Sequence, residues 1–150
     1  MRTLRRRVRI CLRREASGQS LVEFALVVVM FLLLVVGIVE FGRAWNLYQI
    51  LANASREGAR LAALPNGFTT ASAVTTTVRN YLATGNVPPG KTTITIGGAG
   101  VDGGTGTQVS VTLAYPYNFL FVGPIVRLIN PGATAGADVT IQAQTVMRNE

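Results

Sequence analysis

The sequence contains no histidine, and its one cysteine, Cys11, lies near the N-terminus. An intrachain disulfide is therefore impossible, and cysteines cannot build a metal cluster. Without histidine, the chain also lacks imidazole for acid–base catalysis and for metal binding. Acidic residues are few as well, since only Asp102, Asp138 and Glu150 follow Pro65. These absences predict that the protein is not an enzyme and holds neither a metal nor a cofactor.

Positive charge is concentrated in the first 18 residues. The chain carries 14 basic and 7 acidic residues, a net charge of +7. Seven arginines and one glutamate precede Gly18, so this leader has a net charge of +6, which leaves +1 for residues 19–150. The arginines are Arg2, Arg5, Arg6, Arg7, Arg9, Arg13 and Arg14. Such a cluster can bind nucleic acid or anionic lipid, but beside an apolar segment it fixes the cytoplasmic side of a membrane protein. We expect a cytoplasmic leader, an extracytoplasmic body and no nucleic-acid partner.

An apolar run from Leu21 to Phe41 follows the leader, and between its two glutamates it has no charged side chain. Its length, about 20 residues, is enough for a helix to cross a hydrocarbon core of roughly 30 Å. Trp45 and Tyr48 follow, where aromatic side chains favour the headgroup level. A removable secretory signal is the alternative, but its apolar core is normally about 7–15 residues and ends at a small-residue cleavage site. The run predicts a retained helix in the lipid bilayer over about residues 21–41.

The helical pattern continues beyond the run as far as Leu64. Apolar residues recur at steps of three and four on one side, and polar residues occupy the other. The apolar stripe consists of Leu47, Ile50, Leu51, Ala54, Gly58 and Leu61, and the polar side of Gln49, Asn53, Arg56, Glu57 and Arg60. Pro65-Asn66-Gly67 then ends the helix. We predict a leader at 1–18, one continuous helix at 19–64 and an extracytoplasmic domain at 65–150.

The C-terminal body combines helix and strand patterns. Apolar spacing predicts a helix near 69–83, and the glycines and prolines of 85–90 break it. The apolar segment 115–126 is too short to span a membrane, so we expect it to cover the core, with a contact surface for a partner as the alternative. Three antiparallel strands on a helical layer predict an α+β body. Alternating residues place the strands at 92–96, 108–113 and 138–147, with a glycine-rich hairpin loop between the first two.

Three stretches of the N-terminal half carry a family resemblance. They are Gly18…Val22-Glu23-Phe24-Ala25-Leu26-Val27, Gly37-Ile38-Val39-Glu40-Phe41-Gly42-Arg43 and Asn53-Ala54-Ser55-Arg56-Glu57-Gly58-Ala59-Arg60. Together they resemble the TadE-like family of pilin-like proteins from tight-adherence (Flp) pilus systems. The ending Val146–Glu150 resembles the end of such proteins. The family motif on the outer helix then comprises Asn53, Arg56, Glu57, Gly58 and Arg60.

The resemblance implies a minor pilin-like subunit, or pseudopilin, that takes part in assembly of a Flp-type (type IVb) pilus. A prepilin peptidase would cut between Gly18 and Gln19. The implied partners are this peptidase, other pilin-like subunits and inner-membrane pilus assembly proteins, and the implied location is the bacterial inner membrane. Val29 stands where such proteins often carry a proline, so the span should lack a proline kink.

Glu23 would be the fifth residue of the mature chain. A charged side chain at the centre of a membrane helix costs roughly 2.5–3.5 kcal/mol, and less near the interface. The amine freed at Gln19 can pair with Glu23, in the same subunit or a neighbour, and this pairing would set the axial register between helices. Glu23 and Phe24 are therefore candidate assembly residues. For Glu23, the alternative is that it is solvated among the headgroups. For the whole chain, the alternative is an uncleaved, signal-anchored extracytoplasmic binding module.

Overall fold

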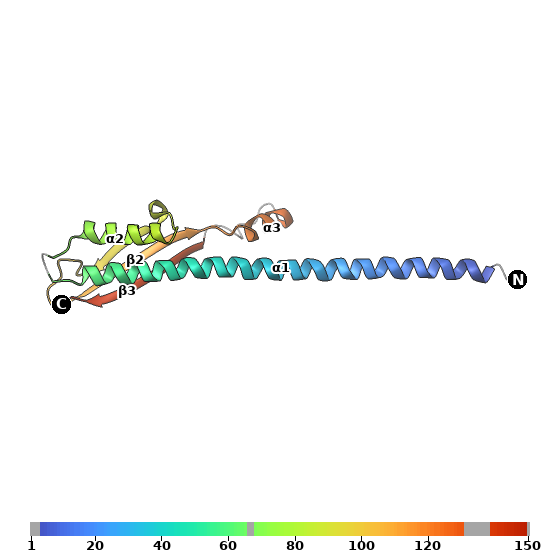
Figure 1. Ribbon diagram of the computed structural model, residues 1–150, viewed down its shortest axis with the longest axis horizontal. Coiled ribbons are helices and arrows are strands. Elements are labelled where there is room, and N and C mark those ends of the chain that lie inside the picture. The colour runs from blue at the N-terminus through green and yellow to red at the C-terminus, as the bar shows by residue number, and fades with distance from the viewer. Residues whose placement is uncertain (1–3, 66–67, 131–138, 150) are drawn as a thin grey trace. The chain divides into compact units, whose positions relative to one another are not determined.

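A long helix and a short three-stranded sheet form most of the regular structure (Figure 1). The computed structural model describes residues 4–65, 68–130 and 139–149, with side chains from Gly18 onward except that of Ile129. The elements are α1 (Leu4–Ala62), α2 (Ala71–Thr84), the 3-10 turn η1 (Pro89–Lys91), β1 (Thr93–Gly98), β2 (Gln108–Tyr117), α3 (Val122–Ile129) and β3 (Val139–Arg148). A long apolar helix followed by a small body of helices and antiparallel strands confirms the predicted α+β class.

Helix α1 is continuous for 59 residues. It begins at Leu4, ahead of the predicted start at Gln19, because Gly18 alone costs a helix only about 1 kcal/mol and does not end it. Its last residue is Ala62, shortly before Pro65, since a proline disfavours helical geometry in the residue that precedes it. The segment Gly18–Ala62 is long and apolar enough to cross a membrane. Among the described residues, one helix meets this condition.

The chain divides into two compact units between Val39 and Glu40. The first unit contains the leader and nearly all of the apolar run. The second unit, called the body below, contains the rest of α1 together with every other helix and strand. The outer part of α1, Glu40–Ala62, therefore belongs to the same unit as the sheet.

The sheet is antiparallel in the order β1-β2-β3. In its register Ile96 pairs with Val111, Ile94 with Leu113, and Leu113 in turn with Ala143. Side chains alternate between the two faces of a strand, so these apolar residues share one face. The residues between them on β2 and β3 are mostly polar, and the glutamines of β3 are exposed. One face of the sheet is therefore available to pack against helices.

The outer part of α1 and α2 cover that apolar face, and Figure 1 shows α2 beside the outer part of α1. Thr70 is the N-cap residue of α2, and its hydroxyl accepts a hydrogen bond from the Ala73 N–H at 3.2 Å. This side-chain cap satisfies one of the free N–H groups at the helix start. The fully buried apolar residues include Leu51, Ala54 and Ala59 of α1, Val74, Val78 and Leu82 of α2, and Val109, Val111 and Leu113 of β2.

A buried polar contact joins α1 to the last strand. The Ser55 hydroxyl lies 2.8 Å from the Thr145 hydroxyl of β3 and donates to the Ala52 carbonyl at 2.9 Å. Ser55 is fully buried, and a buried hydroxyl without a partner would be costly. The contact therefore favours the position of α1 on the sheet in which Ser55 faces Thr145.

The apolar segment 115–126 differs in part from the prediction. Its first three residues extend β2 to Tyr117, which is buried. Pro116 fits there because β1 pairs with β2 only as far as Ala114, so Pro116 has a neighbouring strand on one side alone. The expectation that the whole segment covers the core is wrong for Leu120 and Phe121, which are exposed. The chain leaves the sheet at Tyr117 and therefore carries them beyond the core.

Gly58 allows α1 to pack closely against α2 and β2. A Cβ at this position would lie 2.6 Å from Val78 Cγ2 and 3.4 Å from Val111 Cγ1. We predict that Gly58→Ala lowers the free energy of unfolding by about 1–3 kcal/mol, the usual cost of overpacking. Urea unfolding of the full chain in detergent micelles, followed by near-UV circular dichroism, measures this change.

Gly42→Ala is the matched control, because among the described residues nothing lies within 4 Å of a Cβ built on Gly42. The double variant Gly58→Ala/Val78→Ala should be less destabilised than the two single changes added together. Equal stability of Gly58→Ala and Gly42→Ala would contradict the close contact.

Candidate functional site

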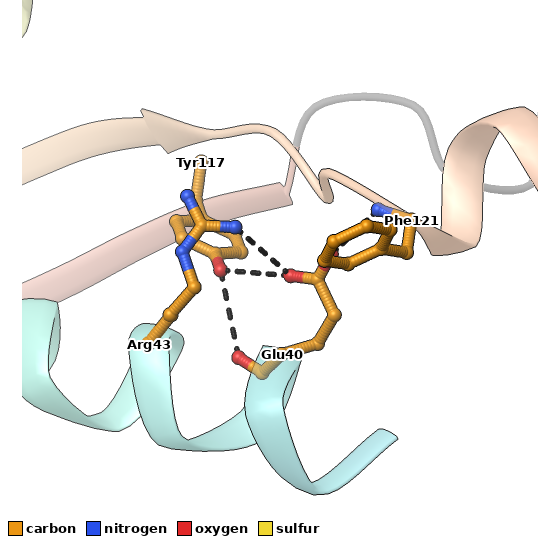
Figure 2. Close-up of polar contacts among 4 residues, drawn as sticks. All are labelled: Glu40, Arg43, Tyr117 and Phe121. Carbon is orange, nitrogen blue, oxygen red and sulfur yellow. Dashed lines mark hydrogen bonds and ion pairs between the residues drawn. The ribbon is translucent and has the colours of Figure 1, made fainter. Parts of the chain in front are cut away.

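The body begins with a buried carboxylate. Glu40 ends the uncharged part of the apolar run, yet its side chain turns into the body, and the residue is only 2% exposed. Figure 2 shows Glu40 facing Tyr117 at the end of β2, Phe121 before α3, and Arg43 one turn further along α1. These four residues are called the Glu40 cluster below.

Hydrogen bonds satisfy both carboxylate oxygens of Glu40. The Phe121 backbone N–H donates to Oε1 at 2.6 Å, and the Tyr117 hydroxyl donates to Oε2 at 3.1 Å. Arg43 Nη1 lies 3.5 Å from Oε2, and the Arg43 side chain is 46% exposed. A buried charge is tolerated when it is paired and hydrogen-bonded. Glu40 therefore ties the end of β2 and the start of α3 to α1.

The bond to Phe121 also caps α3. Phe121 is the N-cap residue of this helix, and its own side chain makes no capping hydrogen bond. A carboxylate near a helix N-terminus is stabilised by the free N–H groups and the positive end of the helix dipole. Glu40 supplies this carboxylate from a position 81 residues earlier in the chain. The start of α3 is therefore set by α1.

Tyr117 donates rather than accepts in this cluster. Burial and the hydrogen bond to Glu40 raise the pKa of the Tyr117 hydroxyl, and the nearby Arg43 charge opposes the shift. The ring also meets Phe119 edge to face, with ring centroids 5.3 Å apart. The neutral phenol is therefore the form that the folded body favours, and it remains a donor to Glu40 throughout the physiological pH range.

An open groove of about 280 Å³ adjoins the cluster. The outer part of α1 lines one side, with Arg43 and Ile50, and the loop after α2 lines the other. Tyr115 and Tyr117 also line it. Its polar groups can accept and donate hydrogen bonds, but the described lining residues offer neither a thiol nor a carboxylate for covalent or metal chemistry.

The predicted processing residues, Gly18 and Gln19, and the candidate assembly residues, Glu23 and Phe24, lie close together on α1. Gly18, Gln19, Glu23 and Phe24 are all exposed. Gln19 Nε2 donates a hydrogen bond to Glu23 Oε1 at 3.0 Å, one helical turn away. The six candidate topology residues Arg5, Arg6, Arg7, Arg9, Arg13 and Arg14 fall within the helical range of α1, and their side chains lie outside those described.

The outer-helix motif divides between two faces of α1. Gly58 faces the core, whereas Asn53, Arg56 and Arg60 are exposed and Glu57 is half-buried. Arg56 donates to Asn53 at 3.1 Å, and Arg60 donates to both oxygens of Glu57, at 2.7 and 3.2 Å. The Arg60 hydrogen bond lowers the pKa of Glu57, so this carboxylate stays ionised. The four polar residues form an ordered outward strip, called the polar strip below.

Sequence reasoning missed the Glu40 cluster. Glu40 could be noticed as a charge at the end of the apolar run, but the residues that bind it lie 77 and 81 positions further along the chain. One of these partners is a backbone N–H, which every residue except proline carries. The sequence signal was therefore limited to Glu40 itself.

Comparison with known proteins agrees with the resemblance noted in the sequence. Residues 18–60 match a protein family described as TadE-like protein. The matched range includes Gly18, Gln19, Glu23, Glu40 and the motif that ends at Arg60. No curated protein and no solved structure is significantly similar to the chain.

The raised pKa of Tyr117 gives the body a dependence on alkaline pH. Because the folded-state pKa exceeds the ordinary value of about 10, the contribution of Tyr117 is complete below pH 10. It is lost as the pH rises through the folded-state pKa. We predict that a tyrosinate absorbance titration of the full chain in micelles shows a component above pH 10 that Tyr117→Phe removes.

Tyr81→Phe is the control and should retain that component. Glu40→Gln should move it toward lower pH without returning it fully to about 10, because burial still raises the pKa. A Tyr117 component at the ordinary pKa would contradict the buried hydrogen bond to Glu40.

Proposed function

Because residues 18–60 are TadE-like, which links the chain to tight-adherence (Flp) pilus systems, we propose that the protein is a minor pilin-like subunit of pilus assembly. One observation carries this proposal, namely a family match that runs from the predicted cleavage site through the apolar run into the body. In this proposal the protein is anchored in the bacterial inner membrane by a single span. The arginine-rich leader is cytoplasmic, the body is extracytoplasmic, and the role is not enzymatic.

The proposed processing removes the leader between Gly18 and Gln19. Both residues lie inside α1 in the uncut chain, so a prepilin peptidase must open the helix locally to reach the bond. Glycine is the residue that weakens a helix most after proline, by about 1 kcal/mol relative to alanine. Gly18 is also exposed, and among the described residues nothing lies within 4 Å of a Cβ built on it. These properties support Gly18 as the position where the helix yields to the peptidase.

The hydrogen bond between Gln19 and Glu23 suggests how the carboxylate is accommodated before and after cutting. In the uncut chain Glu23 already has a neutral partner, the Gln19 side chain, at 3.0 Å. Cutting would give Gln19 an α-amino group with an ordinary pKa of about 7.7–8.0, mostly protonated at neutral pH. We assign Glu23 as its partner, within the subunit or between neighbouring subunits. Phe24 follows on the exposed surface of the helix, where a neighbouring span can contact it.

The polar strip is the proposed contact surface for other pilin-like subunits or inner-membrane assembly proteins. Exposed ion pairs contribute only about 0–1 kcal/mol to stability, so the fold itself gains little from the Glu57–Arg60 pair. The pair does hold two charges in a defined geometry on a helix that Gly58 fixes against the core. An ordered charge pattern favours specific partners over wrong ones.

Leader removal is the direct test of this proposal. We predict that the protein loses its first 18 residues in cells that contain a prepilin peptidase, and that Gly18→Ala prevents the loss. Gly37→Ala is the matched control, because Gly37 also lies in α1 with open space around a built Cβ. The intact mass of the protein, purified from the membranes of cells with and without the peptidase, shows whether the leader has been removed. A wild-type mass that never falls would instead support an uncleaved, signal-anchored binding module.

The charge of Glu23 is tested separately from cleavage. We predict that Glu23→Val and Glu23→Gln still insert into the membrane but lose most of their co-purification with the pilus assembly proteins. Glu23→Gln keeps a hydrogen-bonding group for Gln19 and removes only the charge. Val22→Leu, at the adjacent position, should behave as wild type. Co-purification of Glu23→Val at the wild-type level would exclude the pairing model.

A further inference from the structure

The segment from Leu120 to Leu128 carries a group of exposed apolar side chains on the body. Leu120 is 56% exposed and Leu128 87% exposed. Phe121, Ile125 and Leu128 follow one another at steps of four and three, so they lie along one side of α3. Single exposed leucines are ordinary on protein surfaces. An apolar side on a whole helix calls for an occupant.

The Glu40 cluster fixes where this segment lies along the chain's path out of the membrane. The Phe121 N–H is 2.6 Å from Glu40 Oε1, and Glu40 directly follows Val39, the last residue of the uncharged run. A residue in that position lies at the boundary between hydrocarbon and headgroups if the run spans the bilayer. The start of α3 must therefore lie at the same level.

Aromatic side chains on α1 mark the same level independently. Phe41, Trp45 and Tyr48 follow Glu40 and are exposed along one side of the helix. Their rings form a continuous row, with centroids 6.2 Å apart for Phe41 and Trp45 and 5.8 Å apart for Trp45 and Tyr48. Tryptophan and tyrosine are enriched at membrane–water interfaces. The row and the exposed side of α3 thus begin within one or two helical turns of Glu40.

We propose that α3, together with Leu120 and Phe121, is an interfacial anchor that inserts its apolar side into the outer face of the membrane. Apolar side chains enter the boundary between headgroups and acyl chains in such helices, while basic residues remain with the phosphates. Arg127 is exposed on α3 and is available for a lipid phosphate. If the apolar run of α1 spans the membrane, the bilayer surrounds it up to Glu40. The bilayer is therefore the nearest apolar surface that the exposed side of α3 can contact.

A second copy of the chain fits this surface less well. A stable protein interface usually buries about 800 Å² on each partner. Helix α3 has only 8 residues, too few to supply such an area. A lipid surface needs no such minimum area, because its acyl chains adapt to any exposed apolar group. The proposal rests on membrane anchoring of α1 and not on pilus assembly.

The test places a nitroxide spin label on the full-length protein in vesicles of phosphatidylcholine and phosphatidylglycerol. Cys11→Ser removes the native thiol, Leu128→Cys introduces the label on α3, and Ala73→Cys on α2 is the matched aqueous control. Oxygen partitions into the bilayer, whereas a nickel chelate stays in water. We expect the ratio of oxygen to nickel accessibility to be several-fold higher at position 128 than at position 73. Adding Glu40→Gln should reduce this ratio at 128 and leave 73 unchanged.

Two results would overturn the proposal. Equal ratios at positions 128 and 73 would show that α3 lies in water. A label at 128 that is shielded from both reagents, with spin–spin broadening that grows as the protein-to-lipid ratio rises, would show that another copy covers α3. Neither result depends on leader cleavage, so a failure here is distinguishable from a failure of the proposed function.

Discussion

Burial of one carboxylate, Glu40, determines how the rest of the chain meets its long helix. A charged group that leaves water must find donors, and removing one partner of such a buried pair typically costs about 3–5 kcal/mol. Here the donors are the Tyr117 phenol at the end of β2 and the backbone N–H of Phe121, the N-cap residue of α3. The same residue is thus the first charge after the uncharged run, the cap of α3 and the hydrogen-bonding partner of the end of β2. A change at Glu40 would disturb all three together.

The outer part of α1 is as much a core element as the sheet. Its inner side carries the fully buried residues Leu51, Ala54 and Ala59, and Gly58 lets α2 and β2 approach it closely. Larger side chains on the opposite side remain polar and ordered. One helix therefore combines an apolar half, suited to lipid, with an amphipathic half whose inner face completes a protein core. The family match covers both halves, and it ends at Arg60, where the polar strip ends.

Features encoded by local pattern could be predicted from the sequence, and features that depend on distant partners could not. The apolar stripe through Leu47 and Leu51 follows from helical periodicity, and both residues are buried. The three strands follow from alternation, and the hairpin between β1 and β2 from its glycines. The position of α3 cannot be read from a local sequence pattern, because it depends on a hydrogen bond from the Phe121 backbone N–H to Glu40. The helical leader was not predicted, because the helix was expected to begin after Gly18, and a single glycine does not end a helix.

The contact between Ser55 and Thr145 joins residues 90 positions apart. Closing so long a loop costs entropy before any contact repays it, and such topologies fold slowly. On a ribosome, Ser55 emerges 90 residues before Thr145. The part of α1 that contacts β3 therefore stays uncovered until β3 has been made. The core of the body is incomplete until then, and this interval is the period of its greatest exposure to proteases and aggregation.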